Sequence, residues 1–430
     1  MTINSFMDNV FDKIDKYNFW SSTPKTGYIR LKYLGWLQQF NDNRLVKVLV
    51  GQRRVGKSYV LRQYIEQLIV NGVSPLNTLY INTEYLEYDF LTDYKKLNEF
   101  IHQYKSHFKL KGKYYLFIDE IQQIVGWEKT INSLSQDFTQ DIEIVITGSN
   151  SELLSGELST LLSGRYVQIM VLPFSFSEYC NFLNIELNRA SYLNYLQTGG
   201  LPELFHLPNE ETKRHYIAAL RDTVLLRDVI QRHQIKDAAL LLDVFSYLVN
   251  NVSTLTSITN LVNYYKDKKR KTSFDTIANY IEYIQQTFII HRCERFDLKG
   301  KEILGGNVKY YLNDLSFKNY LYSGYTQGFG YLLENLVYLQ LINHGFVTYI
   351  GHLRNQEIDF VAQKNGKKIY IQVAFTTENE KTNNREQSSL LAIKDNYEKW
   401  IICMDELPFS NKDGIIYIPV WTLDEVLAKW

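Results

Sequence analysis

A run of eight residues in the first quarter of the chain has the residue types and the spacing to hold a polyphosphate. Gly51 to Ser58 reads GQRRVGKS and fits the pattern G-x-x-x-x-G-K-[ST] at every fixed position. The two glycines let the backbone turn its N–H groups onto a phosphate, and a helix that begins at Lys57 adds unpaired N–H groups and a positive dipole end. Lys57 adds a full charge, and Ser58 would supply a hydroxyl to Mg²⁺.

We therefore expect this segment to bind ATP and Mg²⁺. Leu45 to Val50 is a short β-branched run typical of a buried strand, and Tyr59 to Val70 repeats apolar residues at helical spacing, so the loop has the strand-loop-helix context it requires. The alternative is a glycine-rich turn before a helix that holds no ligand. The residues expected to contact the nucleotide are Gly51, Gln52, Arg53, Arg54, Val55, Gly56, Lys57, Ser58 and Tyr59.

Two carboxylates, Asp119 and Glu120, end a second apolar run that begins at Tyr114 and reads YYLFIDE. We expect Asp119 to hold Mg²⁺ through water together with Ser58, and Glu120 to orient and deprotonate an attacking water. Such an acidic pair favours hydrolysis over kinase chemistry. An apolar strand that ends in Asp-Glu is common by itself, so the prediction depends on the loop upstream.

Two further residues are candidates for contact with the γ-phosphate. The strand Ile142 to Ile146 runs into TGSN, and ligands of parallel sheets bind at the carboxyl ends of strands, so Asn150 is expected to act as a sensor. A helix cap is the alternative. Arg165 precedes the apolar run Val167 to Leu172 and could be an arginine finger, acting in its own subunit or from a neighbour. Its alternative is a solvated surface arginine.

The bulk composition indicates a folded protein of more than one domain. The 430 residues suggest two to four domains. The 47 basic residues balance 47 acidic ones, so the protein has no net positive charge that would attract it to nucleic acid. The three cysteines are far apart in the sequence, which favours neither a disulfide framework nor a zinc site. We predict a cytoplasmic protein, because the sequence has neither a secretion signal nor a long apolar run.

The chain resembles the AAA-type ATPases of bacteria and archaea that carry a C-terminal domain of unknown function. The segments that carry the resemblance are GQRRVGKS, YLFIDEIQ, ITGSN, LLSGRY followed by LPFSFSEY, and TGGLPE. The resemblance implies an α/β fold with a P-loop NTPase parallel sheet in residues 1–174, whose catalytic glutamate lies beside Asp119, and a helical lid in 175–232. It also implies a C-terminal half built from a winged helix and a nuclease-like fold.

Residues 233–320 show the pattern of a winged helix-turn-helix, with three helical segments followed by two strands. A basic run lies before the third helix, where such a domain contacts phosphates. A solvated loop in a protein-interaction domain is the alternative. The candidate nucleic-acid contacts are Lys268, Lys269, Arg270 and Lys271.

Residues 321–430 resemble the restriction-endonuclease-like PD-(D/E)XK fold. A helix glutamate, a strand aspartate and a tight Asn-Gly hairpin occur in the expected order, with Glu334, Glu357, Asp359 and Gln372 as the site residues. The resemblance implies a metal at Asp359 and Gln372 and a lysine where Ala374 stands. Unless Lys368 or another residue takes that place, we predict an inactive nuclease core.

These features favour an ATP-hydrolysing switch or remodelling protein that acts on DNA or a protein partner and could assemble into an oligomer. An ATP-regulated, metal-dependent nuclease is one alternative, which Ala374 disfavours. A signalling scaffold that binds ATP with little turnover is the other, which Glu120 disfavours.

Overall fold

The computed structural model describes residues 3–149, 162, 164–322, 328–406 and 413–430. The chain divides into two compact units, Met1–Val171 and Leu172–Trp430. The division falls three residues before the predicted end of the nucleotide domain at residue 174. No helix within the described ranges is long and apolar enough to span a bilayer.

The first unit is built on a five-stranded parallel sheet with the order β2-β3-β4-β1-β5. Four of the five strands, β1 to β4, are buried along their length, as expected for β-branched and aromatic runs covered on both faces. This confirms the predicted parallel α/β sheet. The strands are β1 Val46–Val50, β2 Thr78–Asn82, β3 Tyr114–Asp119, β4 Ile142–Gly148 and β5 Tyr166–Met170.

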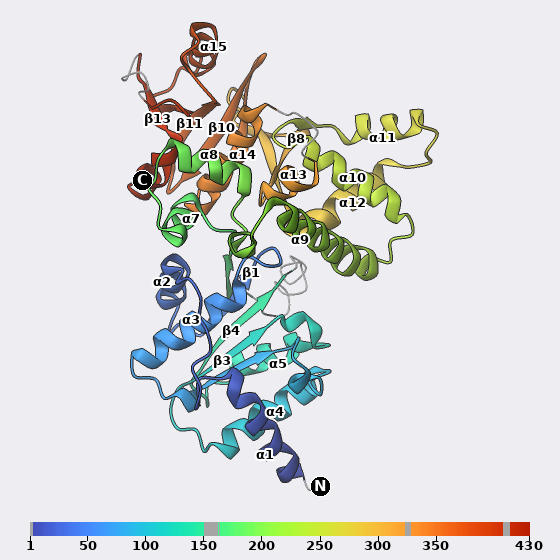
Figure 1. Ribbon diagram of the computed structural model, residues 1–430, viewed down its shortest axis with the longest axis vertical. Coiled ribbons are helices and arrows are strands. Elements are labelled where there is room, and N and C mark those ends of the chain that lie inside the picture. Colours follow the sequence, from blue (N-terminus) through green and yellow to red (C-terminus); the bar gives the residue numbers. More distant parts are fainter. Residues whose placement is uncertain (1–2, 150–161, 163, 323–327, 407–412) are drawn as a thin grey trace. The chain divides into compact units, whose positions relative to one another are not determined.

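Helices cover both faces of this sheet (Figure 1). The connection from β1 to β2 crosses the sheet in one direction, whereas the connections from β2 to β3 and from β3 to β4 cross it in the other direction. Because such crossovers are right-handed, the helix α3 lies on one face of the sheet, and the helices α4 and α5 lie on the opposite face. The carboxyl ends of β1, β3 and β4 therefore meet at one edge. The helices are α1 Ile3–Ile14, α2 Leu31–Gln39, α3 Lys57–Val70, α4 Tyr94–His107 and α5 Trp127–Gln136.

The second unit contains a mixed eight-stranded sheet with the order β13-β12-β11-β10-β9-β7-β8-β6. Its strands are β6 Leu255–Thr256, β7 Ile290–Asp297, β8 Glu302–Leu312, β9 Val347–Leu353, β10 Gln356–Lys364, β11 Lys367–Ala374, β12 Glu398–Cys403 and β13 Ile415–Pro419. Its helices are α7 Phe176–Leu183, α8 Arg189–Thr198, α9 Glu210–Thr223, α10 Ala238–Asn250, α11 Ile258–Asp267, α12 Phe274–Gln286, α13 Ser316–Leu321, α14 Phe329–Asn343, α15 Glu380–Leu391 and α16 Leu423–Ala428.

The hairpin β7–β8 belongs to this larger sheet. Three helices, α10 to α12, precede it as predicted, but Arg295 to Asp297 of β7 also pair in parallel with Ile350 to His352 of β9. The sheet therefore continues across the predicted boundary at residue 320, and the hairpin is not a free wing.

The helical segment 175–232 is part of the second unit rather than a separate lid body. Its α9 packs against α13, and its α8 packs against α14. The TGGLPE motif packs closely against Asp314. The N–H of Gly200 donates to Asp314 Oδ2 at 2.7 Å. The neighbouring Gly199 has φ +83°, and a Cβ at this residue would lie 2.2 Å from Asp314 Oδ1. Glycine is required at Gly199 for both reasons.

The predicted Asn-Gly hairpin joins β10 to β11. Asn365 and Gly366 have φ of +51° and +76°, the left-handed conformations that a two-residue hairpin turn needs. The register pairs Phe360 with Ile371, so Asp359 comes to lie opposite Gln372. The turn thereby assembles two of the predicted site residues.

Candidate functional site

The loop GQRRVGKS connects the carboxyl end of β1 to the N-terminus of α3, as predicted. Its two glycines are needed for different reasons. Gly51 has φ +148°, and a Cβ there would lie 2.3 Å from the carbonyl oxygen of Val171, so close backbone packing excludes a side chain. Gly56 has φ +97° with open space around it, so it is needed for its backbone conformation alone. A buried arginine, Arg30, braces the loop by donating from Nη1 to the carbonyl oxygen of Val55 at 3.2 Å.

Lys57 is the first residue of α3, and its side chain is only 4% exposed. Its Nζ donates to the carbonyl oxygens of Gly51 and Gln52 at 2.9 and 3.1 Å. The same atom lies 3.7 Å from Oε1 of Glu120. The lysine predicted to hold phosphate and the glutamate predicted to act as base are therefore adjacent.

Asp119 is fully buried at the end of β3 and accepts hydrogen bonds from several neighbours. Its Oδ2 accepts from the Tyr80 hydroxyl at 2.9 Å and from Asn82 Nδ2 at 3.3 Å, and its Oδ1 accepts from the Thr147 hydroxyl. Burial raises the pKa of Asp119, the charge of Glu120 raises it further, and hydrogen bonds from Ser58 and Thr147 oppose the rise. Ser58 and Asp119 thus bring a hydroxyl and a carboxylate together, the hard oxygen donors that suit Mg²⁺.

Glu120 has a left-handed backbone, with φ +54° and ψ +46°, which is strained for a residue other than glycine. Two threonines hold its peptide groups: its N–H donates to the Thr147 hydroxyl at 3.0 Å, and its carbonyl oxygen accepts from the Thr83 hydroxyl at 2.7 Å. Burial would raise the pKa of Glu120, but the Lys57 charge, a hydrogen bond from Gln122 and the Arg53 charge bring it below its ordinary value. The carboxylate is therefore ionised at neutral pH.

The remaining predicted contacts of this site have different outcomes. Asn150 lies outside the described residues. Arg165 is exposed and comes just before Tyr166, which pairs with Val46 at the start of β1, whereas the loop follows the end of β1. Arg165 is therefore level with Leu45, six residues before Gly51, and at about 3.3 Å per residue it lies roughly 20 Å along the strand from the loop. This geometry argues against a finger that acts in its own subunit, and action from a neighbour stays a prediction.

Sequence reasoning missed the residues that position the catalytic pair. Thr147 contacts both Asp119 and the peptide of Glu120, yet the sequence showed only a polar residue at a strand end. Tyr80 and Asn82 alternate on β2 and were assigned to a strand without a role. Their register opposite β3, with Asn82 beside Asp119, depends on the sheet order, which one sequence does not reveal.

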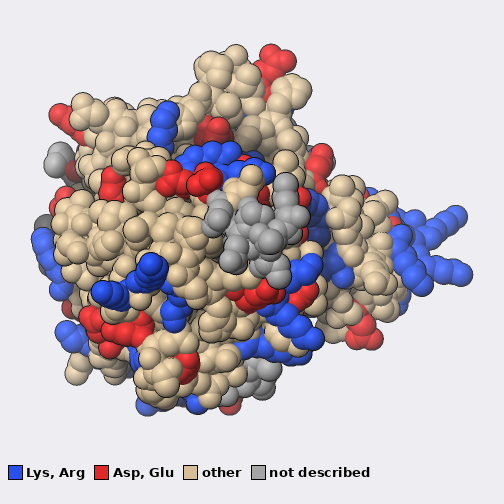
Figure 2. Space-filling model, turned by 90° about the horizontal axis from the view of Figure 1, so that it is seen from below, with Lys and Arg blue, Asp and Glu red and all other residues tan. Residues whose placement is uncertain are grey.

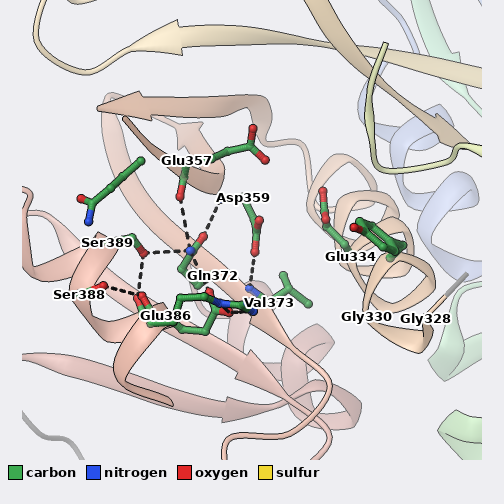
Figure 3. Close-up of a pocket in the computed structure, with 13 residues that line it drawn as sticks. Gly328, Gly330, Glu334, Glu357, Asp359, Gln372, Val373, Glu386, Ser388 and Ser389 are labelled. Atoms are coloured by element: carbon green, nitrogen blue, oxygen red, sulfur yellow. Dashed lines mark hydrogen bonds and ion pairs between the residues drawn. The ribbon is translucent and has the colours of Figure 1, made fainter. Parts of the chain in front are cut away.

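In the second unit, four predicted site residues line one cavity of ≈ 510 Å³ (Figure 3). Glu357, Asp359 and Gln372 lie on the neighbouring strands β10 and β11, and Glu334 lies on α14. Gln372 is fully engaged: its Oε1 accepts from the Asp359 N–H at 2.6 Å, and its Nε2 donates to Glu386 and Ser389 at 3.0 and 2.9 Å. Among the described residues, no group of three or more His, Cys, Asp or Glu side chains is arranged to hold a metal ion.

A lysine does enter this cluster, from β8, a strand that sequence reasoning assigned to the winged helix-turn-helix and not to this site. Lys309 on β8 is buried, and its Nζ lies 2.9 Å from Glu334 Oε1 and 2.8 Å from Glu357 Oε1. Burial would lower the pKa of Lys309, but the charges of Glu334, Asp359 and Glu357 raise it. Lys368 instead lies over the ring of Phe296 at 5.1 Å. The expectation of a cluster without a positive group is corrected by Lys309.

Burial raises the pKa of Asp359 well above its ordinary value, and the charge of Glu334 adds to this rise. Its Oδ2 accepts from the N–H of Val373 at 2.7 Å. The pKa of Glu334 is also raised by burial, although Lys309 opposes the rise. The positive charge of Lys309 thus lies beside carboxyl groups, Glu334 and Asp359, that burial makes harder to ionise.

The predicted basic segment follows α11, and Figure 2 shows Lys and Arg side chains gathered at the right-hand edge, where α11 lies. Lys268, Lys269 and Lys271 are exposed. Arg270 differs, because its guanidinium donates to Asp237 at 3.0 Å and also to Asp243. Of the four predicted nucleic-acid contacts, this one is engaged within the fold.

Comparison with known proteins agrees with this description. Residues 43–180 match the model of the AAA domain. Residues 189–327 and 329–423 match two domains of unknown function, DUF8612 and DUF4143. The Walker-type ATPase PABY2304 of Pyrococcus abyssi is similar in structure, with a TM-score of 0.44 and 16% identity over 70% of this chain and 99% of that chain.

The parallel sheet and its loop thus define an AAA-type P-loop domain, a nucleotide-binding fold that typically uses Mg²⁺. In sequence the chain is 36% identical over 400 residues to an uncharacterized protein of Haemophilus influenzae, covering 92% of this chain and 98% of the relative. An uncharacterized protein of Methanocaldococcus jannaschii is 32% identical over 366 residues, 81% of this chain and 79% of the relative. The chain belongs to the family of these two proteins.

Proposed function

We propose that the protein is an ATPase that works as a switch or remodelling protein. The observation that supports this best is the arrangement of Lys57, Asp119 and Glu120 at one edge of the parallel sheet, with the ammonium of Lys57 3.7 Å from the carboxylate of Glu120. A scaffold that only binds ATP has no need for a buried, ionised glutamate at this position.

Each residue of the site has a part in this proposal. Lys57 holds the β- and γ-phosphates, and the N-terminus of α3 adds its unpaired N–H groups. Ser58 and Asp119 would hold Mg²⁺, which would neutralise negative charge on the phosphate groups. Glu120 accepts a hydrogen bond from the attacking water and takes its proton, and the lowered pKa keeps it ready at neutral pH. Thr147 fixes the backbone that carries Asp119 and Glu120.

Two substitutions test the proposal on the full-length protein. Lys57→Ala removes the phosphate contact and should abolish binding of a fluorescent ATP analogue. Glu120→Gln leaves the phosphate contacts in place, so it should bind the analogue while turnover falls by about a hundredfold or more. Turnover by Glu120→Gln equal to that of wild type would contradict the assignment of the base.

For the second unit we propose a winged-helix-like segment, in residues 233–320, whose hairpin continues the sheet of a nuclease-like domain, in 321–430, and we propose that this unit binds a DNA or protein partner without cutting it. Support comes from the side-chain contacts: Lys309 lies between Glu334 and Glu357, and Gln372 is engaged by hydrogen bonds. A cation already balances the carboxylates that a nuclease of this fold would use for metal.

The test is cleavage of plasmid and linear DNA with Mg²⁺ or Mn²⁺, with and without ATP. We expect no cleavage above background. Metal-dependent cleavage that disappears in Asp359→Ala would contradict the proposal and favour the alternative of an ATP-regulated nuclease, with Lys309 as its positive group.

A further inference from the structure

Arg53, the third residue of the phosphate-binding loop, reaches across the carboxyl edge of the first sheet. The loop follows β1, whereas its partner Glu84 follows β2, and the order β2-β3-β4-β1 separates these strands by three spacings of about 4.8 Å. Arg53 Nη1 nevertheless lies 3.6 Å from Glu84 Oε1. The loop and the arginine side chain together therefore extend over the ends of β4 and β3, which carry Thr147 and Asp119.

The proposed base lies at the same edge of the sheet. Glu120 follows the end of β3, and Lys57, which belongs to the same phosphate-binding loop as Arg53, has its Nζ 3.7 Å from Oε1 of Glu120. Arg53 is also mostly buried, with its side chain 13% exposed. Two cations of one loop, Lys57 and Arg53, thus lie at the edge that carries the proposed base.

The ion pair between Arg53 and Glu84 is weak enough for a phosphate group to replace Glu84 as the partner of Arg53. The Glu84 side chain is 42% exposed, and ion pairs with a solvated partner are weak because water screens the charges. A triphosphate carries more charge and accepts two parallel hydrogen bonds from a guanidinium. Glu84 can therefore hold Arg53 at this edge and release it to a phosphate.

We propose that Arg53 is a catalytic arginine that acts on the γ-phosphoryl group within its own subunit. This inference rests on the proposed ATPase function. Water forms a bond to the γ-phosphorus while the bond from that phosphorus to the β–γ bridging oxygen breaks, the water proton passes to Glu120, and ADP and phosphate result. Arg53 exchanges no proton and stabilises the negative charge of the transferring group, as an arginine finger does. Arg165 comes just before the start of β5, whereas the loop follows the end of β1, so Arg165 does not contact the γ-phosphoryl group of its own subunit.

The first test compares Arg53→Gln and Arg53→Lys with Lys96→Gln, which removes an exposed charge of the same unit away from the site. We expect kcat to fall by about a hundredfold or more in Arg53→Gln and at least about tenfold in Arg53→Lys, because lysine lacks the planar fork. The Kd for a fluorescent ATP analogue should change by less than about fivefold, which also shows that the variants fold. Lys96→Gln should match wild type.

The second test mixes Arg53→Gln with Glu120→Gln. If Arg53 acts within its own subunit, neither protein has a complete site and the mixture stays inactive. Recovery of turnover on mixing would overturn the proposal, because it would show action between subunits. Turnover of Arg53→Gln within about threefold of wild type, or loss of analogue binding, would also overturn it. A wild-type protein that binds no ATP would contradict the proposed ATPase function itself.

Discussion

Lys309 on β8 and Glu334 on α14 form an ion pair that is almost fully buried, with Nζ 2.9 Å from Oε1 and side-chain exposures of 5% and 8%. The Tyr311 hydroxyl donates to the same Glu334 oxygen at 2.6 Å. The pair connects a strand of the mixed sheet to the helix that packs on it. It also explains why an otherwise apolar helix carries a glutamate.

Removal of the lysine should destabilise the second unit severely. Lys309→Met leaves Glu334 buried without its cation, and we expect a loss of about 3–5 kcal/mol in the free energy of unfolding. The double variant Lys309→Met/Glu334→Gln should recover part of this loss, because the buried charge of Glu334 is removed together with its cation. Urea unfolding measures both. Lys301→Met, an exposed lysine on the same hairpin, is the control and should lie within about 0.5 kcal/mol of wild type.

Gly199 should not tolerate a side chain. In Gly199→Ala the new Cβ would meet Asp314 Oδ1 at 2.2 Å and the Ser316 nitrogen at 3.0 Å, in a backbone conformation that favours glycine. We expect a loss of at least about 2 kcal/mol in thermal or urea unfolding. Gly35→Ala is the matched control, since it lies within α2 with open space around it and should be neutral or slightly stabilising. Equal stability of the two variants would contradict the prediction.

Asp314 should make stability depend on pH between about 4 and 6. Burial raises its pKa to about 6, although N–H groups of Gly200 and Ser316 donate to it. A carboxyl with a raised pKa favours folding when protonated, so its contribution is complete below the unfolded value near 3.9 and is lost as pH rises through 6.

Two pH units correspond to about 3 kcal/mol. Asp314→Asn does not titrate, so the stability of wild type relative to this variant should fall by about 2–3 kcal/mol between pH 4 and pH 7 in urea unfolding. A difference that is constant over this range would rule out the raised pKa.

The basic segment after α11 should bind DNA through its lysines and not through Arg270. Replacement of Lys268, Lys269 and Lys271 by alanine should weaken binding and reduce the slope of log K against log salt by about 2.7, which corresponds to three lost phosphate contacts. Arg270→Ala should change the slope by less than one and lower stability by about 1 kcal/mol or less, because its contacts are to Asp237 and Asp243. Unchanged DNA retention in the triple variant would favour a protein partner.

Local patterns predicted those parts of the structure that depend on neighbours in sequence. The loop from Gly51 to Ser58 and the Asn365–Gly366 turn follow from backbone conformations that few residues adopt, and both were predicted. Asp119 and Glu120 were predicted because a strand end fixes their place beside the loop. The roles assigned to these residues stay predictions that the experiments above address.

Residues that act through distant pairing could not be predicted in the same way. Lys309 lies in the apolar run VKYYL and looked like one residue of an ordinary strand, because nothing local indicates that β8 passes by α14 and β10. Arg165 was a candidate for the γ-phosphate because only its sequence neighbours were visible, and the parallel register of β5 with β1 places it away from the loop. Arg53 was expected to contact the nucleotide, and its ion pair with Glu84, which follows a strand three positions away in the sheet, depends on the sheet order.

The position of Lys309 also limits how the family can change over evolutionary time. Its strand pairs with β7 through Cys293 and with β6 through Leu255, while its side chain joins Glu334 and Glu357. Loss of the lysine alone would leave buried carboxylates without a cation, and loss of the glutamates alone would leave a buried ammonium group. Substitutions at Lys309 and Glu334 should therefore occur together in related sequences, as a pair separated by 25 positions in the chain and joined in the fold.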